Sequence, residues 1–204
     1  MGQAHSFRGS GGGDRRRAIL DAALAAFDAV GYEDTTIAAI RERSGASTGS
    51  IYHHFESKEG IAGALYEEAV EHYRSGLLAR VDAIAGARDL VRAVVLYHLE
   101  WAVQHPAWAR YLLRMRHTEG VLAREDTLRR GTRDFLERMQ ALLQPHVEQG
   151  RIVRLPAALY PLVIIGPTQD MIRDWLAGRL ALDPRAVADT LADLAWKALR
   201  TDAR

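Results

Sequence analysis

The fold is decided by residues 35–60, which read TTIAAIRERSGASTGSIYHHFESKEG. Thr36 is placed to cap a short helix that stops at Gly45, and Ser47 is placed to cap a second one. Ser57 then opens a long helix with an acidic residue in its first turn, where the helix dipole favours an anion. Two short helices joined by a glycine-containing turn are typical of the helix-turn-helix, whose second helix enters the major groove of DNA.

The charge of this region does not by itself predict a nucleic-acid partner. With histidine neutral, no charged residue lies between Ser44 and Phe55. Residues 1–60 hold seven basic and eight acidic side chains, a net charge of −1, and the whole chain carries +1. Any prediction of DNA binding must therefore rest on where individual side chains are placed.

Length and composition are those of an ordinary globular protein. The 204 residues are 48% apolar and 26% charged, and they allow one or two domains. No apolar run approaches the roughly 18 residues that span a bilayer, and the N-terminus lacks the apolar core of a secretory signal. The chain has no cysteine, which fits a reducing compartment. We therefore expect a cytoplasmic protein without a membrane partner.

The rest of the chain also has helical periodicity. In residues 14–30 the apolar positions recur at steps of three and four, and Gly31 follows the last of them. The later periodic segments cover residues 58–84, 90–104, 107–116, 125–149, 157–177 and 184–200. No alternating strand pattern is longer than residues 151–155. The predicted class is all-α, with about nine helices.

A set of short motifs in residues 18–66 carries a family resemblance. They are a helix that ends Phe27-x-x-x-Gly31-Tyr32, the run Thr35-Thr36-Ile37, the turn Gly45-x-Ser47, the pair Tyr52-x-x-Phe55 and the triplet Ser57-Lys58-Glu59. As a set they resemble the DNA-binding domain of TetR-family (TetR/AcrR) transcriptional repressors. The remaining three quarters of the chain resembles the family only in being helical.

The resemblance implies a homodimer in which each subunit places its second short helix in the major groove of a palindromic operator. It also implies a C-terminal domain that binds a small molecule and dimerises. The expected organisation is a flexible leader over residues 1–13, a helix-turn-helix domain over 14–60 and a helical effector-binding and dimerisation domain over 61–204. In the family the last two helices form the dimer, and Pro167 should bend the first of them.

The candidate DNA contacts are small or uncharged side chains around the second short helix. Hydroxyl groups and a helix N-terminus can donate to phosphates, and a helix without bulky side chains can approach the groove closely. Gly49 costs about 1 kcal/mol relative to alanine in a helix, so either the helix tolerates it or the position requires bare backbone for close approach to the groove. The predicted set is Thr36, Arg41, Ser47, Thr48, Gly49, Ser50, Tyr52, His53 and Lys58. The alternative is a capped helix with a merely polar face.

Two members of this set need separate reasons. Arg41 stands where many family members carry a small alanine, so whether it meets a phosphate or a base edge is open. Lys58 lies in the first turn of a helix, where the dipole disfavours a cation by a few tenths of a kcal/mol, and this suggests a compensating phosphate. Arg15, Arg16 and Arg17 are either a basic arm on the DNA backbone or a solvated face.

The C-terminal part offers large, polarisable side chains that suit either a core or an effector site. His98 and Trp101 share a helix face at a three-residue step, which makes them the first candidates for contact with a largely apolar effector. The predicted ligand-binding set is His98, Trp101, Trp108, Met115, Met171 and Trp175.

No catalytic, metal or cofactor site is predicted. The chain lacks a phosphate loop, and its eight histidines form no His-x-x-x-His pair. The expected function is a ligand-responsive repressor that a small-molecule effector releases from DNA. Two alternatives stay open, namely a DNA-binding protein that organises the chromosome or division, and a small-molecule carrier with a vestigial DNA-binding domain. The sign of regulation is also open.

Overall fold

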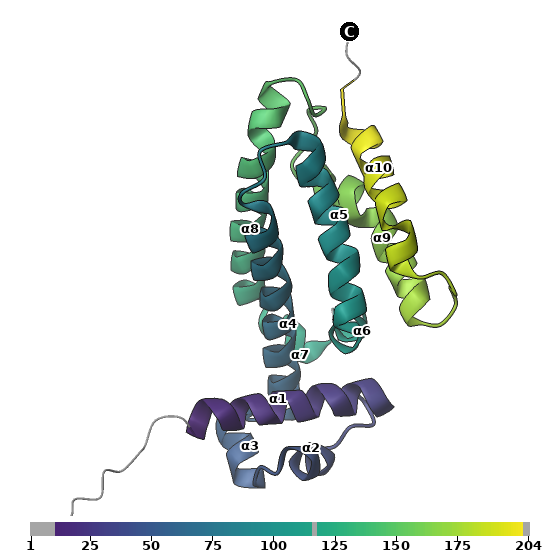
Figure 1. Cartoon of the computed structure of the whole chain (residues 1–204). Helices are drawn as coiled ribbons and strands as arrows, with labels where there is room; N and C mark the ends of the chain where they lie inside the picture. Colours follow the sequence, from purple (N-terminus) through teal and green to yellow (C-terminus); the bar gives the residue numbers. More distant parts are fainter. Residues whose placement is uncertain (1–10, 116–117, 202–204) are drawn as a thin grey trace, which may run out of the picture. The chain divides into compact units, whose positions relative to one another are not determined.

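A computed structural model of the chain describes residues 11–115 and 118–201 (Figure 1). Helices α1 to α10 and one 3-10 turn, η1, account for the regular structure of this part. Its only β pairing is an isolated antiparallel bridge between Ile152 and Arg200, at the place where the sequence alternates. The all-α prediction is confirmed. None of the described helices is both long and apolar enough to cross a membrane.

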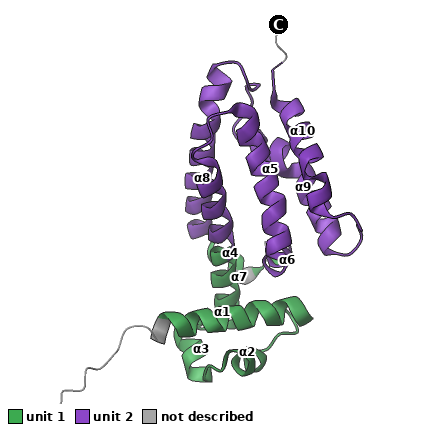
Figure 2. Ribbon diagram, viewed as in Figure 1, with its two compact units in different colours: residues 1–68, 114–125 green, residues 69–113, 126–204 purple. Residues whose placement is uncertain are grey.

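The chain divides into two compact units, coloured separately in Figure 2. The first unit consists of Met1–Glu68 and Arg114–Glu125, and the second of Ala69–Leu113 and Asp126–Arg204. The leader predicted over residues 1–13 lies outside the described residues up to residue 10. The following glycines are already helical, because α1 begins at Gly11.

The first unit is built around the helix-turn-helix. Its elements are α1 (Gly11–Val30), α2 (Ile37–Ser44), α3 (Thr48–Phe55), the first turns of α4 (Lys58–Val81) and the short α7 (Glu119–Leu122). On α1 the buried side chains Ile19, Leu20, Ala23 and Phe27 follow the three- and four-residue spacing seen in the sequence. This face packs against α2 and α3.

The predicted helix ends agree with the structure wherever a local side chain sets them. Thr36 Oγ1 accepts a hydrogen bond from Ala39 N at 3.1 Å, and Ser47 Oγ accepts one from Ser50 N at 3.1 Å. Ser57 Oγ accepts one from Gly60 N at 3.0 Å and so caps α4. Gly45 ends α2 with φ +62°, a left-handed conformation that favours glycine.

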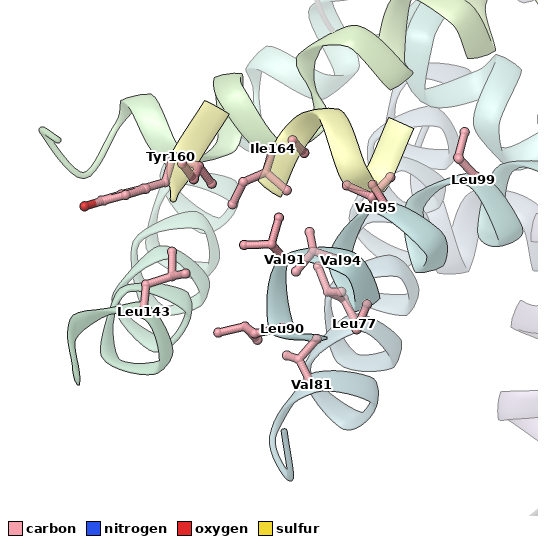
Figure 3. Close-up of a cluster of buried hydrophobic side chains, with 14 of the residues drawn as sticks. Leu77, Val81, Leu90, Val91, Val94, Val95, Leu99, Leu143, Tyr160 and Ile164 are labelled. Atoms are coloured by element: carbon pink, nitrogen blue, oxygen red, sulfur yellow. The ribbon is translucent and has the colours of Figure 1, made fainter. Parts of the chain in front are cut away.

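The second unit contains the rest of α4 and the later helices. These are α5 (Ala87–Gln104), α6 (Pro106–Met115), α8 (Glu125–Glu148), α9 (Leu159–Leu176), η1 (Pro184–Val187) and α10 (Ala188–Leu199), of which α6 and α8 begin or end at the unit boundary. Buried apolar side chains of α4, α5, α8, α9 and α10 form most of its core. Figure 3 labels side chains from the first four of these helices. Helix α5 packs against both α9 and α10.

Two features of the helices differ from the prediction. Helix α7 was not predicted, and Arg116, the expected end of the preceding helix, lies outside the described residues. Asp183 does cap the last segment, since its Oδ1 accepts from Arg185 N at 2.9 Å. That segment nevertheless begins as the 3-10 turn η1 and becomes α-helical only at Ala188.

Candidate functional site

Helix α3 has one face that holds it in place and another that is exposed. Ile51 and Phe55 lie one turn apart and are only 1% and 5% exposed. Burying these two apolar side chains fixes the helix in a unit where α3 packs against α1 and α2. The helix therefore presents a defined set of other side chains outward.

The exposed face of α3 carries most of the predicted contact set. Thr48, Gly49, Tyr52 and His53 are exposed, with Tyr52 at 48%, and Ser50 is half-buried. A Cβ atom added to Gly49 would meet nothing within 4 Å. Packing within the protein therefore does not require glycine at position 49. Either a molecule outside the folded chain requires it, or the helix merely tolerates it.

The two capping hydroxyls hold helix ends in place and can also donate a hydrogen bond to a group outside the protein. Thr36 and Ser47 are exposed residues whose oxygens accept hydrogen bonds from backbone amides. An oxygen that accepts in this way keeps its own proton as a donor, which a phosphate oxygen can use. Arg41 is exposed in the last turn of α2, next to the exposed Arg43. The structure thus leaves all three outward contacts as predictions.

Lys58 has a role that the sequence argument missed. Its Nζ donates to three backbone carbonyls, those of Tyr32 at 3.0 Å, Glu33 at 3.2 Å and Thr35 at 3.1 Å. The ammonium also lies 4.5 Å from the centroid of the Tyr32 ring. All three N–H donors are therefore used within the protein. These carbonyls, rather than a phosphate, compensate the charge of Lys58 in the folded chain, and Lys58 positions the turn before α2.

Neighbouring residues reinforce this attachment of the turn to α4. The hydroxyl of Tyr32 donates to Glu59 Oε1 at 3.1 Å. The pKa of Glu59 is lowered from its usual value, first by a hydrogen bond from its own backbone amide and then by Ser57, Tyr32 and the charge of Lys58. We call Tyr32, Lys58 and Glu59 the turn latch. Two of the three residues of the Ser57-Lys58-Glu59 motif thus hold the helix-turn-helix together.

Replacing Lys58 by methionine is expected to lower the free energy of unfolding of the first unit by about 1–3 kcal/mol, because three carbonyls lose a charged donor. Operator affinity should fall with it, but the slope of log affinity against log salt should stay unchanged. A lost phosphate contact would instead reduce that slope by about one. Lys197→Met is the matched control, since Lys197 is the only other lysine and is exposed on α10. Chemical denaturation and salt titrations measure both quantities.

The basic run at the start of α1 is tied to its own unit. Arg15 donates to the carbonyl of Gly45 at 3.3 Å, and Arg16 lies 3.6 Å from a Glu68 oxygen. Arg17 pairs with both Asp21 and Glu68. These pairings give the three arginines structural partners. They weaken the interpretation of this run as a free arm on the DNA backbone.

A cluster of aromatic and histidine rings lies in the second unit. It joins three predicted ligand residues, His98, Trp101 and Trp108, to residues of α4 that the sequence did not single out. We call it the aromatic cluster, and it consists of His72, Tyr73, Tyr97, His98, Trp101, His105 and Trp108. The ring of Tyr73 meets those of His98 and Trp101 edge to face, with centroids 5.6 and 5.3 Å apart.

Hydrogen bonds fix the polar atoms of this cluster. Trp101 Nε1 donates to His72 Nδ1 at 3.0 Å, and the hydroxyl of Tyr97 donates to the backbone carbonyl of Tyr73 at 3.1 Å. The Tyr73 hydroxyl lies 2.9 Å from His98 Nδ1. Burial raises the pKa of the Tyr73 hydroxyl and lowers the pKa of His98 to about 4. Both groups are therefore neutral at pH 7.

Among the residues that the structure describes, no ring contact or hydrogen bond joins the other predicted ligand residues to this cluster. Met115 belongs to the first unit and is buried there. Met171 lies on α9 and packs against the apolar core, and Trp175 lies near the end of the same helix. Their role as ligand residues stays a prediction. In the described part of the chain, no group of three histidine or acidic residues could hold a metal ion.

Comparison with known proteins identifies a family for most of the helix-turn-helix region in the first unit. Residues 19–65, which span α1 to the start of α4, match the model of the bacterial regulatory proteins of the tetR family. This match identifies residues 19–65 as a tetR-family DNA-binding region. Among curated tetR-family relatives, the HTH-type transcriptional regulator BetI of Escherichia coli O139:H28 (strain E24377A / ETEC) is 39% identical over 83 residues. This match covers 40% of the chain and 43% of BetI, so it spans less than half of that relative.

Solved structures extend the tetR-family fold to most of the chain. FadR from Bacillus subtilis, solved in complex with stearoyl-CoA, has a TM-score of 0.76 at 19% identity and covers 88% of this chain and 96% of its own. The fatty acid degradation regulator FadR from Bacillus halodurans has a TM-score of 0.74 at 21% identity, with 90% and 99% covered. At these identities the likeness establishes the fold.

Proposed function

We propose that this chain is a one-component transcriptional regulator, and specifically a repressor that binds a palindromic operator as a homodimer. The observation that carries the proposal is the two-sided helix α3, which Ile51 and Phe55 hold from within the unit while Thr48, Gly49 and Tyr52 are exposed. An exposed helix with small side chains and no charge suits close packing against a groove. The cytoplasm is where we expect it to act.

The proposed mode of binding explains how a unit without excess positive charge holds DNA. The N-terminus of α3 and the hydroxyls of Thr36, Ser47 and Thr48 supply donors for phosphates, so affinity does not depend on lysine. Tyr52 and His53 then reach base edges or thymine methyl groups. Arg41 adds one cation beside this surface, in contact with the backbone or with a base.

We further propose that a small, largely apolar effector binds the second unit and releases the DNA. FadR of Bacillus subtilis, which shares the fold, was solved in complex with stearoyl-CoA, and the apolar acyl chain of that ligand supports an effector with apolar surface here. The aromatic cluster is the proposed place of contact. A ligand shifts the equilibrium between two forms only by the difference in its affinity for them. Effector binding is therefore proposed to favour a form of the dimer that does not fit the operator.

The decisive test is the Tyr52→Ala variant, which we expect to bind the operator about tenfold or more weakly while it keeps the wild-type unfolding temperature. Tyr52 is exposed, so its loss removes contacts with DNA rather than packing. The operator is first selected from random duplexes with the purified full chain. Binding is then measured by fluorescence anisotropy at several salt concentrations.

Two further variants sharpen this test. Gly49→Ala adds a methyl group on the exposed face and should also weaken operator binding, although the protein itself has room for it. Val30→Ala changes another exposed side chain of the first unit and should leave affinity unchanged. Unaltered binding by both Tyr52→Ala and Gly49→Ala would refute the proposed surface. Weak, strongly salt-dependent binding by the wild type would favour the carrier alternative.

A further inference from the structure

His98 carries a polar atom that the protein leaves unused. Its Nδ1 lies 2.9 Å from the hydroxyl of Tyr73, between α5 and α4. Its Nε2 is buried, and no group of the described residues forms a hydrogen bond with it. Leaving a buried donor or acceptor unpaired costs about 1–3 kcal/mol, so such atoms are rare in folded proteins. An unpaired Nε2 that destabilises the folded chain by this amount suggests that His98 has a function.

The hydrogen bonds available to His98 and Tyr73 determine the tautomer of His98. If the Tyr73 hydroxyl donates to Nδ1, then Nε2 carries the proton and is the one unsatisfied group. If Nδ1 donates instead, Nε2 becomes an unpaired acceptor and the Tyr73 hydroxyl proton has no acceptor among its contacts in the structure. The first arrangement leaves one group unpaired and the second leaves two. His98 therefore presents a buried Nε2–H donor.

The protonation state of His98 sets the charge of what it can bind. Burial lowers the pKa of His98 to about 4, so the imidazole is neutral near pH 7. A neutral N–H pairs well with a neutral carbonyl oxygen. A carboxylate would bring an uncompensated charge into a buried site, and the free energy of desolvating that charge is far larger than the stabilisation from one hydrogen bond.

Two neighbouring rings on α5 have already used their own donors. Trp101 Nε1 donates to His72, and the Tyr97 hydroxyl donates to the Tyr73 carbonyl. The Tyr97 hydroxyl fits only because residue 76 is glycine, where an added Cβ would lie 2.2 Å from it. Among the ring groups that Tyr97, His98 and Trp101 contribute from α5, His98 Nε2–H is thus the donor without an acceptor. Such surroundings suit an apolar molecule with one acceptor.

We propose that His98 Nε2–H is the polar contact of the effector site, and that the effector is a neutral, largely apolar carbonyl compound. This rests on the proposed function to the extent that the bound compound is taken to regulate DNA binding. Tyr73 is a positioning residue, because its hydroxyl holds His98 in the tautomer that donates. Trp101 and the edge of Tyr73 supply apolar surface beside the carbonyl.

Binding of matched probes tests the proposal. Acetophenone carries the carbonyl, ethylbenzene is nearly the same size without it, and benzoate carries a charge. Calorimetry with the full chain should give acetophenone the lowest Kd of the three. The double variant Tyr73→Phe/His98→Phe removes both polar groups and keeps both rings. In it we expect the preference for acetophenone over ethylbenzene to fall about fivefold to tenfold, the effect of about one hydrogen bond.

The double variant is chosen so that folding does not obscure the result. His98→Phe alone leaves the Tyr73 hydroxyl without an acceptor, whereas replacing both partners with apolar groups of similar shape can be neutral or stabilising. Its unfolding temperature without probe should therefore equal or exceed that of the wild type. An acetophenone preference that is absent from the wild type, or unchanged in the double variant, overturns the proposal.

Nitrogen-15 NMR of the histidine rings gives an independent readout. We expect His98 to show the Nε2–H tautomer, to stay neutral above about pH 5, and to respond to acetophenone at Nε2. An Nδ1–H tautomer overturns the proposal. Operator binding is measured on the same samples. If the chain binds the operator but shows no preference for acetophenone, only the inference about His98 is refuted. If it prefers acetophenone but does not bind the operator, the proposed DNA-binding function is refuted and the binding site at His98 is retained.

Discussion

The Gly60→Ala variant is expected to lose its ordered helix-turn-helix, with the free energy of unfolding of the first unit lowered by about 3 kcal/mol. An added Cβ would lie 1.9 Å from the carbonyl oxygen of Phe55, a backbone atom that also accepts from Ser57 N at 2.6 Å. Alanine in a helix gains at most about 1 kcal/mol over glycine, so the clash dominates. The unfolding temperature should drop by roughly 10–20 °C.

The expected loss can be localised within the chain. Hydrogen–deuterium exchange should rise in α2 and α3, and operator binding should fall in parallel. Gly49→Ala is the matched control, because it makes the same change in the same unit at a position with open space. Its unfolding temperature should stay at or above that of the wild type. Equal losses of stability in the two variants would show that the close approach of Gly60 to Phe55 does not hold α3 in place.

The parts of the fold that the sequence predicted well depend on neighbouring residues. Thr36, Ser47 and Ser57 cap helices within three residues of themselves, and Gly45 adopts the left-handed conformation that its position requires. Such features follow from backbone chemistry over a few residues. The apolar spacing of α1 is equally local. This is why the helix-turn-helix could be outlined before its structure was available.

The parts that could not be predicted depend on residues far apart in the chain. Lys58 reaches carbonyls 23 to 26 positions earlier, and no pattern in the sequence distinguishes that use from a phosphate contact. Tyr73 joins His98 across 25 positions, and the sequence does not show which face of α4 meets α5. The sequence singles out His98 and Trp101 because they share one helix face, and their role in binding an effector stays a prediction. Their partners on α4 required the fold.

The exposed leucines of the last two helices bear on the proposed dimer. Leu162 on α9 is 64% exposed and Leu194 on α10 is 54% exposed, although α9 and α10 pack against each other. Large exposed apolar side chains on two helices that pack together are typical of a surface that another protein covers. A second copy of the chain is the proposed occupant, as the family resemblance implies. The same two helices also bury Ile164 and Ala195 in their own unit, so they are rigidly held.

The double variant Leu162→Glu/Leu194→Glu is expected to be monomeric and to bind the operator at least about 100-fold more weakly. Four carboxylates would meet in the interface of two variant chains, whereas each exposed position tolerates a charge in the monomer within about 0.5 kcal/mol. Linking two half-site contacts in one dimer raises affinity by about 100-fold or more, and the monomer loses this gain. Leu136→Glu, at a 39% exposed leucine of α8, is the matched control and should stay dimeric. Sedimentation velocity and anisotropy measure the two effects, and a dimer that survives both glutamates would place the interface on another surface.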